Sequence, residues 1–419
     1  MGGVDVLPCG HAANAADFRG CAHLVVERPP DHYGWFTGVG LEYDRLCGEC
    51  AKLDEPRSCL AVVCLGCADR VDEYSELLGW IGRPEVRHHD TAARGVWTTA
   101  DCAVEPVNDR CVAALPGGWL VLTGAGLVEV DRDGARFVAP VSVTASPTED
   151  DPHDPPRLAL HTSPDGRHAA VVTDFGRYGV VLDLVTGDPV LSLDRGDYHY
   201  RQTCFPLVFP TPGVVVTATD WNRLDAFDPA SGRLLTGRET SWSGEGPAPE
   251  HYLDYFHGAL LADPSGRRVL DDGWVWSPFG MPVVLDVAAW LGGDAYATEH
   301  GMDLSARDCW DLPVAWVDDH TVALQPIGRY DRPPLAGVEV YDVLRGRRVG
   351  AFAGPVGRMW GHDGLLYVGT PAGLEIWAPE EGARTGVVEG FTPNAHNPRT
   401  GRFAELAGGR LRTWTPATP

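Results

Sequence analysis

Lysine is almost absent from this chain. Lys52 is the only lysine, and the remaining basic residues are arginines, as is typical of bacterial GC-rich codon usage. The 34 basic residues face 58 acidic ones, so the net charge is −24 at pH 7. Such a chain repels a phosphate backbone, and no basic stripe interrupts the acidic composition. We therefore expect no nucleic-acid partner, whereas an acidic surface favours a basic one.

Long apolar runs are absent too. No stretch approaches the ~20 apolar residues that a membrane-spanning helix needs. Residues 1–16 lack a basic segment followed by an apolar run, so we expect no secretory signal, no membrane association and a cytoplasmic protein. The length of 419 residues and a hydrophobic content of 44% allow a large core, in two or three domains or in one repeat domain with a small companion.

The common catalytic motifs do not occur either. We find no nucleophile elbow, no HExxH and no hydride-transfer fingerprint. Isolated GAG and GVG triplets lack a strand–helix context, so they predict no phosphate loop. These absences favour a binding protein over an enzyme.

Cysteine is plentiful but unevenly placed. Seven of the eleven cysteines lie between Cys9 and Cys67, and four are scattered through the rest of the chain. A secreted disulfide framework is usually shorter and even-numbered. Cysteines concentrated at the front of a chain without a signal indicate metal binding.

The cysteines and histidines of this head, residues 1–85, form four ligand pairs. Two C-x2-C turns separated by thirteen residues are typical of structural zinc, because each turn points two thiolates at one ion. Two Cys-x-His pairs precede them, and residues at i and i+2 also point the same way on a strand. The expected ligands are Cys9, His11, Cys21, His23, Cys47, Cys50, Cys64 and Cys67.

How the pairs combine stays open. Neighbouring pairs give two separate sites, whereas interleaved pairs give the cross-braced arrangement of a RING-type fold, and Cys59 is an alternative ligand. One or two zinc ions would supply folding energy that so small a head lacks. Apolar residues at helical spacing predict a short helix over 68–82. The bacterial-style composition argues against ubiquitin chemistry for a RING-type module.

The rest of the chain is repetitive. A strand pattern ends in Asp and is followed by Gly four residues later in "GVVLDLVTG" (179–187), "LDAFDPASG" (224–232) and "VEVYDVLRG" (338–346). Variants of it occur at 127–134, 281–293, 374–382 and 410–414, which makes seven units. Turns such as "SPDGR" and "DPSGR" and alternating apolar runs predict four antiparallel strands in each unit.

These units resemble the repeats of WD40-type β-propellers, including bacterial relatives with degenerate repeats. The resemblance covers residues 92–419 and implies an all-β, seven-bladed propeller behind the zinc-stapled head. No unit carries the full Gly-His to Trp-Asp signature, of which "GHDG" (361–364) and "EIWA" (375–378) are fragments. The resemblance therefore implies the fold but no particular function.

The last unit ends after its third strand. A propeller cannot leave that edge open, so we expect residues 95–104 to supply the missing strand. This connection places the head next to the closing seam. We hypothesise that the head stabilises the junction between the first and last blades. Deleting residues 1–85 would then lower the melting temperature.

Long loops indicate where a ligand binds. They lie at 146–157, 194–202, 239–257, 294–311 and 326–337, and they are rich in Asp, Glu, His, Tyr and Trp. The resemblance implies that these loops share one face. The candidate residues on it are His251, Asp254, Tyr255, His257, Asp197, His199, Trp310 and Asp311.

Two functions follow from this face. The first is a non-catalytic scaffold that binds a protein or peptide through acidic and aromatic loops, and the charge of these loops favours a basic partner. The alternative is a metal-dependent hydrolase, similar to propeller lactonases in holding a cation among carboxylates at the channel mouth. That enzyme would depend on Asp254 or Asp311.

Overall fold

We analysed a computed structural model of the chain. The structure describes residues 86–144, 156–240, 242, 245–276, 278–328 and 336–417, together with the backbone of four short strands in the first 85 residues. The chain divides into two compact units, Met1–Glu85 and Val86–Pro419. None of the helices in the described residues is long and apolar enough to cross a membrane.

The four strands of the first unit form one sheet, in the order β2-β3-β1-β4. They are β1 (Phe18–Cys21), β2 (His32–Trp35), β3 (Asp44–Cys47) and β4 (Leu60–Val63). The side chains of the expected zinc ligands and the helix expected over 68–82 lie outside the described residues.

Seven four-stranded antiparallel blades make up the second unit. Blade one is β7 (Val112–Ala114), β8 (Trp119–Thr123), β9 (Gly126–Asp131) and β10 (Gly134–Ala139). Blade two is β11 (Arg157–Thr162), β12 (His168–Asp174), β13 (Tyr178–Asp183) and β14 (Pro189–Asp194). Blade three is β15 (Leu207–Val208), β16 (Val215–Asp220), β17 (Arg223–Asp228) and β18 (Arg233–Leu234). Blade four is β19 (Phe256–Ala262), β20 (Arg268–Val275), β22 (Val283–Asp286), β23 (Met302–Asp303), with β21 (Phe279–Gly280) paired to β20.

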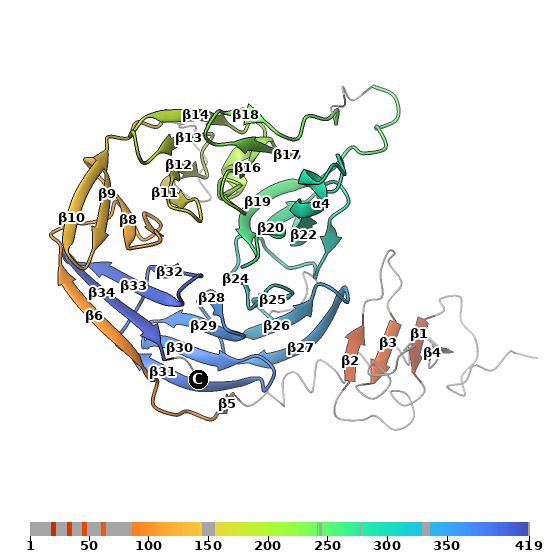
Figure 1. The fold of residues 1–419 in the computed structure, drawn as a ribbon. Helices are drawn as coiled ribbons and strands as arrows, with labels where there is room; N and C mark the ends of the chain where they lie inside the picture. The colour runs from red at the N-terminus through yellow and green to blue at the C-terminus, as the bar shows by residue number, and fades with distance from the viewer. Residues whose placement is uncertain are drawn as a thin grey trace, which may run out of the picture. The chain divides into compact units, whose positions relative to one another are not determined.

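Blade five is β24 (Val314–Trp316), β25 (Thr321–Leu324), β26 (Gly337–Asp342) and β27 (Arg347–Ala353). Blade six is β28 (Arg358–His362), β29 (Leu365–Thr370), β30 (Gly373–Ala378) and β31 (Ala383–Glu389). Blade seven is β32 (Ala395–Asn397), β33 (Arg402–Ala407), β34 (Arg410–Pro416) and β6 (Gly95–Asp101). The blades form a ring in which the first strand of each is innermost (Figure 1). The seven-bladed all-β fold expected from the repeats is thus confirmed.

The Asp-to-Gly spacing of the repeat has a local cause. In blade two, Asp183 ends the third strand, and its carboxylate accepts a hydrogen bond from the backbone N–H of Val185 at 2.8 Å. Gly187 then donates to the Asp183 carbonyl at 2.8 Å with a left-handed φ of 78°. An Asp side chain that bonds two residues ahead and a glycine that accepts positive φ together make a tight hairpin. The same hydrogen bonds recur at Asp228, and the carboxylate bond recurs at Asp342.

The core lies between the blades rather than at the centre of the ring. Each pair of neighbouring blades shares one cluster of buried apolar side chains, including the pair formed by blades seven and one. At that last interface Val112 and Trp119 of blade one pack against Ala404 and Leu411 of blade seven. Every blade is therefore stabilised by both of its neighbours, which makes ring closure necessary.

The ring is closed by the strand that precedes blade one. β6 pairs with β34 in seven consecutive Cα pairs, from Asp101↔Arg410 to Gly95↔Pro416. Trp414 of β34 is buried, and a Cβ atom at Gly95 would lie 2.2 Å from its indole Nε1. A residue without a side chain is therefore required where the closing strand begins.

Two elements were not expected from the sequence. β5 (Arg87–His88) adds a fifth, parallel strand to the outer edge of blade six, and Asp90 accepts two hydrogen bonds from Arg384, at 3.0 and 2.7 Å. A short helix, α4 (Val287–Leu291), occupies the long variant of the repeat in blade four. Asp286 begins this helix and accepts from the Ala289 amide at 2.8 Å, so the Asp that elsewhere makes a hairpin here caps a helix.

Candidate functional site

Long connections gather on the face from which the chain enters the inner strands. The segments 195–206, 235–255 and 304–313 lead into blades three, four and five, whereas 354–357 and 390–394 lead into blades six and seven. One sector of the ring is therefore elaborated, as the loop lengths in the sequence indicated. We describe its central part, the 195–206 loop, first.

Arg195 holds the 195–206 loop in one conformation. Its buried guanidinium donates to the carbonyl oxygens of Gly176, Thr203 and Cys204 at 2.9–3.0 Å and to the hydroxyl of Thr203 at 3.0 Å. It also donates to the carbonyl of Tyr200. Burial lowers the pKa of Arg195 to about 10, so the charge persists at neutral pH. Binding several carbonyl groups of its own loop makes this arginine a rigid internal staple.

The 195–206 loop is also bonded to blade four and to the next long loop. The Thr203 hydroxyl donates to the His257 carbonyl at 3.1 Å. Trp310 donates its indole N–H to the Gln202 carbonyl, and the Cys204 amide donates to the Asp311 carboxylate at 3.4 Å. These bonds connect residues between 54 and 108 positions apart in the sequence, so the loops of this face support one another rather than lying independently.

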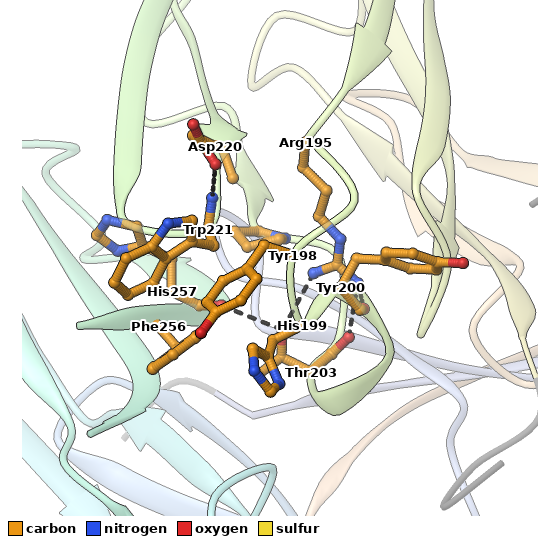
Figure 2. Close-up of a pocket in the computed structure, with 11 residues that line it drawn as sticks. Arg195, Tyr198, His199, Tyr200, Thr203, Asp220, Trp221, Phe256 and His257 are labelled. Atoms are coloured by element: carbon orange, nitrogen blue, oxygen red, sulfur yellow. Dashed lines mark hydrogen bonds between the residues drawn. The ribbon is translucent and has the colours of Figure 1, made fainter. Parts of the chain in front are cut away.

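A small pocket lies between the 195–206 loop and the tops of blades three and four (Figure 2). It encloses about 250 Å³, part of it open to solvent, between the loop residues, the Trp221 turn and the start of β19. Phe256 forms its floor and stacks on Trp274 at 4.0 Å between ring centroids, and Trp274 stacks on Trp310 at 4.7 Å. This stack gives the pocket a rigid apolar base.

Above this base, aromatic side chains reach the surface. We define the aromatic patch as Tyr198, Trp221, Trp242, Tyr252 and Trp276, which come from four different segments. Trp276 is 56% exposed and Tyr198 is 48% exposed, although each contacts other rings. Several large aromatic residues exposed over a shared aromatic base are unusual on a monomer and characterise interaction sites.

Carboxylates flank the aromatic patch. Asp197, Asp220 and Asp254 are exposed at its edge. Partial burial raises the pKa of Tyr252, and the charges of Asp254 and Asp220 raise it further, which places both carboxylates near this ring. Exposed carboxylates therefore border the aromatic patch, and carboxylates beside aromatic rings attract cations.

No family model and no curated protein sequence matches this chain. Among solved structures, it is similar to a chain in the crystal structure of the mitotic checkpoint complex. The TM-score is 0.48 and the sequence identity is 12%, over 80% of this chain and 95% of that chain.

The four residues His251 to His257 that the sequence grouped have separate surroundings. His251 stacks on Tyr296 at 3.7 Å, and its Nδ1 lies 3.2 Å from Nε2 of His300. His257 and Tyr255 are buried instead. The His257 ring bonds the Asp271 carboxylate at 2.5 Å, and the Tyr255 hydroxyl donates to the Asp271 carbonyl at 3.2 Å and the Met281 carbonyl at 2.9 Å. These two side chains join strands, whereas Asp254 stays on the surface.

The other candidates lie in or under the patch. His199 has a left-handed φ of 52°, and its ring contacts Tyr198, Phe256 and Trp276 at centroid distances of 4.3–5.3 Å. Burial lowers the pKa of His199, which keeps the ring neutral near pH 7. Asp311 also has positive φ, and burial together with the charge of Asp272 raises its pKa to about 7.

The described residues hold no group of three or more His, Cys, Asp or Glu side chains placed to bind a metal ion. The important residues that sequence reasoning overlooked are Arg195, Trp221 and Trp276. The two tryptophans stand in the turns "TDWNR" and "WVWSP", directly after the second strands of blades three and four, and a tryptophan in a hairpin turn was the available sequence signal. No comparable sequence signal pointed to Arg195, because most of its partners are backbone carbonyl groups.

Proposed function

We propose that this protein is a non-catalytic scaffold that binds a partner protein or peptide on its aromatic patch. The observation that carries the proposal is that the exposed rings of Tyr198 and Trp276 both pack on Phe256, which belongs to a rigid aromatic stack. A preorganised aromatic surface loses little conformational entropy on binding. The flanking carboxylates and the net charge of −24 favour a segment that carries arginine or lysine next to an apolar side chain.

Peptide selection against the full-length protein tests this function. We expect enriched peptides to combine basic and aromatic or aliphatic residues, and their binding to change tryptophan fluorescence. The double substitution Tyr198→Ala with Trp276→Ala should weaken binding at least tenfold, or by about 1.4 kcal/mol. Both side chains are exposed, so the melting temperature should change little.

Phe137 supplies the matched control, because it is 54% exposed on β10, an outer strand of blade one. Phe137→Ala should leave peptide affinity unchanged. Selected peptides that bind the double variant as tightly as the unaltered protein, or a selection that yields no binder above background, would contradict the proposal.

For the first unit we propose structural zinc, held by the cysteines and histidines of the four ligand pairs. The backbone of the described strands supports a further combination, in which the second pair joins the third. β1 and β3 are parallel, with Gly20 opposite Arg45, and they end at Cys21 and Cys47. Both strand ends therefore lie at the same end of the sheet, so Cys21/His23 and Cys47/Cys50 are suited to one tetrahedral site.

Native mass spectrometry of the full chain tests this combination. We expect two zinc ions in the unaltered protein, and one fewer in both Cys21→Ser and Cys47→Ser. The double variant should also lose only one ion if the two residues share it, and Cys309→Ser in the propeller should lose none. Loss of two ions from the double variant would assign the cysteines to different sites, and a protein without zinc would refute the metal proposal.

A further inference from the structure

The pocket at the top of blades three and four is lined by two segments that the fold holds in contact. Tyr198 belongs to the long loop before blade three, whereas Asp220 ends β16 and Trp221 follows it. A Cβ atom at Gly196 would lie 3.3 Å from Oδ1 of Asp220, so the loop and the turn touch. Both segments line the cavity above Phe256 (Figure 2).

Three aromatic rings of this pocket contact one another. The ring centroid of Trp221 lies 4.4 Å from that of Phe256 and 5.4 Å from that of Tyr198, with interplanar angles of 39° and 63°. Tyr198 and Phe256 are nearly parallel, at 25°, with centroids 6.1 Å apart. A planar group between two ring faces needs about 7 Å, which is twice a van der Waals contact. The spacing therefore disfavours a stacked guanidinium, whereas a compact ammonium group can contact inclined rings from the rim.

Asp220 adds a negative charge beside these rings. Its Oδ1 accepts a hydrogen bond from the Trp221 amide at 2.8 Å, and the residue is exposed. The charges of Asp220 and Asp254 also contribute to the raised pKa of Tyr252, after partial burial of that ring. A cation in the pocket would thus meet ring faces and a carboxylate that a backbone amide holds in place.

Arg195 also lines the pocket, but its donors are engaged within the protein. Its five N–H groups donate to five acceptors, four of which are carbonyl oxygens. Burial lowers the pKa of Arg195, and the charges of Asp174 and Asp311 oppose this shift, so carboxylates lie near the guanidinium. Asp174 pairs with Arg110 as well. The positive charge in this wall is therefore partly balanced, and its hydrogen-bond donors are directed to the loop.

His257 is a further lining residue, and one of its ring nitrogens lacks a partner. Its Nδ1 lies 2.5 Å from the Asp271 carboxylate, which can only accept, so Nδ1 carries the hydrogen and Nε2 of the neutral ring is an acceptor. Nε2 is buried and has no hydrogen-bond partner among the described residues. A buried acceptor without a donor costs free energy, which an N–H group of a ligand would recover.

We propose that this pocket receives the ammonium group of a lysine side chain of the partner. Tyr198, Trp221 and Phe256 supply the rings, and Asp220 supplies the opposing charge. The inference rests on the function proposed above, since it names the chemical group by which the partner is held. It also assigns the basic residue of the partner as lysine rather than arginine.

Butylammonium chloride is a probe that tests the pocket without any peptide. We expect ligand-observed NMR titration of the full-length protein, at about 0.15 M salt to screen the net charge of −24, to show saturable binding. Butan-1-ol has the same chain without the charge, and propylguanidinium carries the charge on a planar group. Both should bind about fivefold or more weakly than butylammonium.

Two substitutions test the residues of the pocket. Asp220→Asn removes the charge and keeps the oxygen that accepts from Trp221, and Tyr198→Leu removes one ring from an exposed position. Each should weaken butylammonium binding by about threefold or more. Asp133→Asn, in an exposed hairpin of blade one, removes the same charge elsewhere and should have no effect. Equal binding of butan-1-ol or propylguanidinium, or an equal loss in the Asp133 variant, would overturn the proposal.

Peptide variants distinguish this inference from the function on which it rests. Exchange of the lysine of a selected peptide for norleucine or for arginine should weaken binding to the full-length protein by about tenfold. Peptides that bind but tolerate both exchanges would overturn the lysine pocket and leave the scaffold function standing. Saturable butylammonium binding without any selected peptide would contradict the scaffold function and retain the ammonium site.

Discussion

At the scale of single residues, the loop face is built on side chains with unusual surroundings. Arg195 binds carbonyl oxygens of its own loop, and Asp311 is a largely buried carboxylate next to Asp272 and the Cys204 amide. Both side chains hold a loop in place, and neither is a member of a sequence motif. Their effect is to fix the surface on which the aromatic patch is displayed.

Asp311 predicts a specific pH dependence of stability. Burial and the Asp272 charge raise its pKa to about 7 in the folded protein, against 3.8 in an unperturbed carboxyl group. Between these values the folded state retains a proton that the unfolded state has released. The free energy of unfolding should therefore fall as the pH rises from about 4 to about 7.

Asp311→Asn mimics the protonated form and keeps the oxygen that accepts from Cys204. We expect this variant to match the unaltered protein at pH 4 and to be more stable above pH 7 by ~1–3 kcal/mol in denaturant unfolding. Asn also tolerates the positive φ of this position. Asp133→Asn, in an exposed hairpin, should show no such gain, and identical pH profiles for the Asp311 variant and the unaltered protein would rule out the elevated pKa.

At the scale of elements, the central observation is that the first strand of the propeller completes its last blade. β6 covers the otherwise open edge of β34 and lies over the buried Trp414. β5 extends this arrangement, since it covers part of the edge of blade six. The segment from Val86 to Asp101 thus belongs structurally to the end of the chain.

Two truncations separate the contribution of β6 from that of the head. Removing residues 1–85 retains both β5 and β6, whereas removing residues 1–101 exposes the β34 edge and Trp414. We expect the longer truncation to lower the melting temperature by more than about 10 °C, or to aggregate. Any smaller decrease caused by the shorter truncation measures the bracing that we hypothesise for the head.

A peptide of residues 92–104 supplied in trans provides the control for a poorly folding truncation. It should raise the melting temperature of the longer truncation and leave that of the shorter one unchanged. Equal melting temperatures for the two truncations would contradict the role of β6 in closure.

At the scale of the whole molecule, the residues that stabilise the ring are separate from the loops that carry the proposed binding surface. The core is divided among the blade interfaces, so the loops of one face can vary without weakening it. Blades three and four carry the aromatic patch. An acidic molecule thus presents, on one sector of one face, an aromatic patch bordered by exposed carboxylates.

The sequence alone determined the architecture of the propeller. Strand alternation and the Asp-to-Gly hairpin depend on residues within a few positions of one another, as the Asp183 and Gly187 hydrogen bonds illustrate. Seven copies of such a unit, the last of them incomplete, required a ring closed by residues preceding the first blade. The helix α4 was overlooked because the same Asp that makes a hairpin also caps a helix.

Only the tertiary structure decided which side chains share a surface. His257 and His251 are six residues apart, yet one joins buried strands and the other lies on a loop. Tyr198, Trp221 and Trp276, by contrast, are separated by many residues, yet all three contact Phe256 because three loops converge on it. Burial and contact across blades depend on how the ring closes, and no local pattern encodes this.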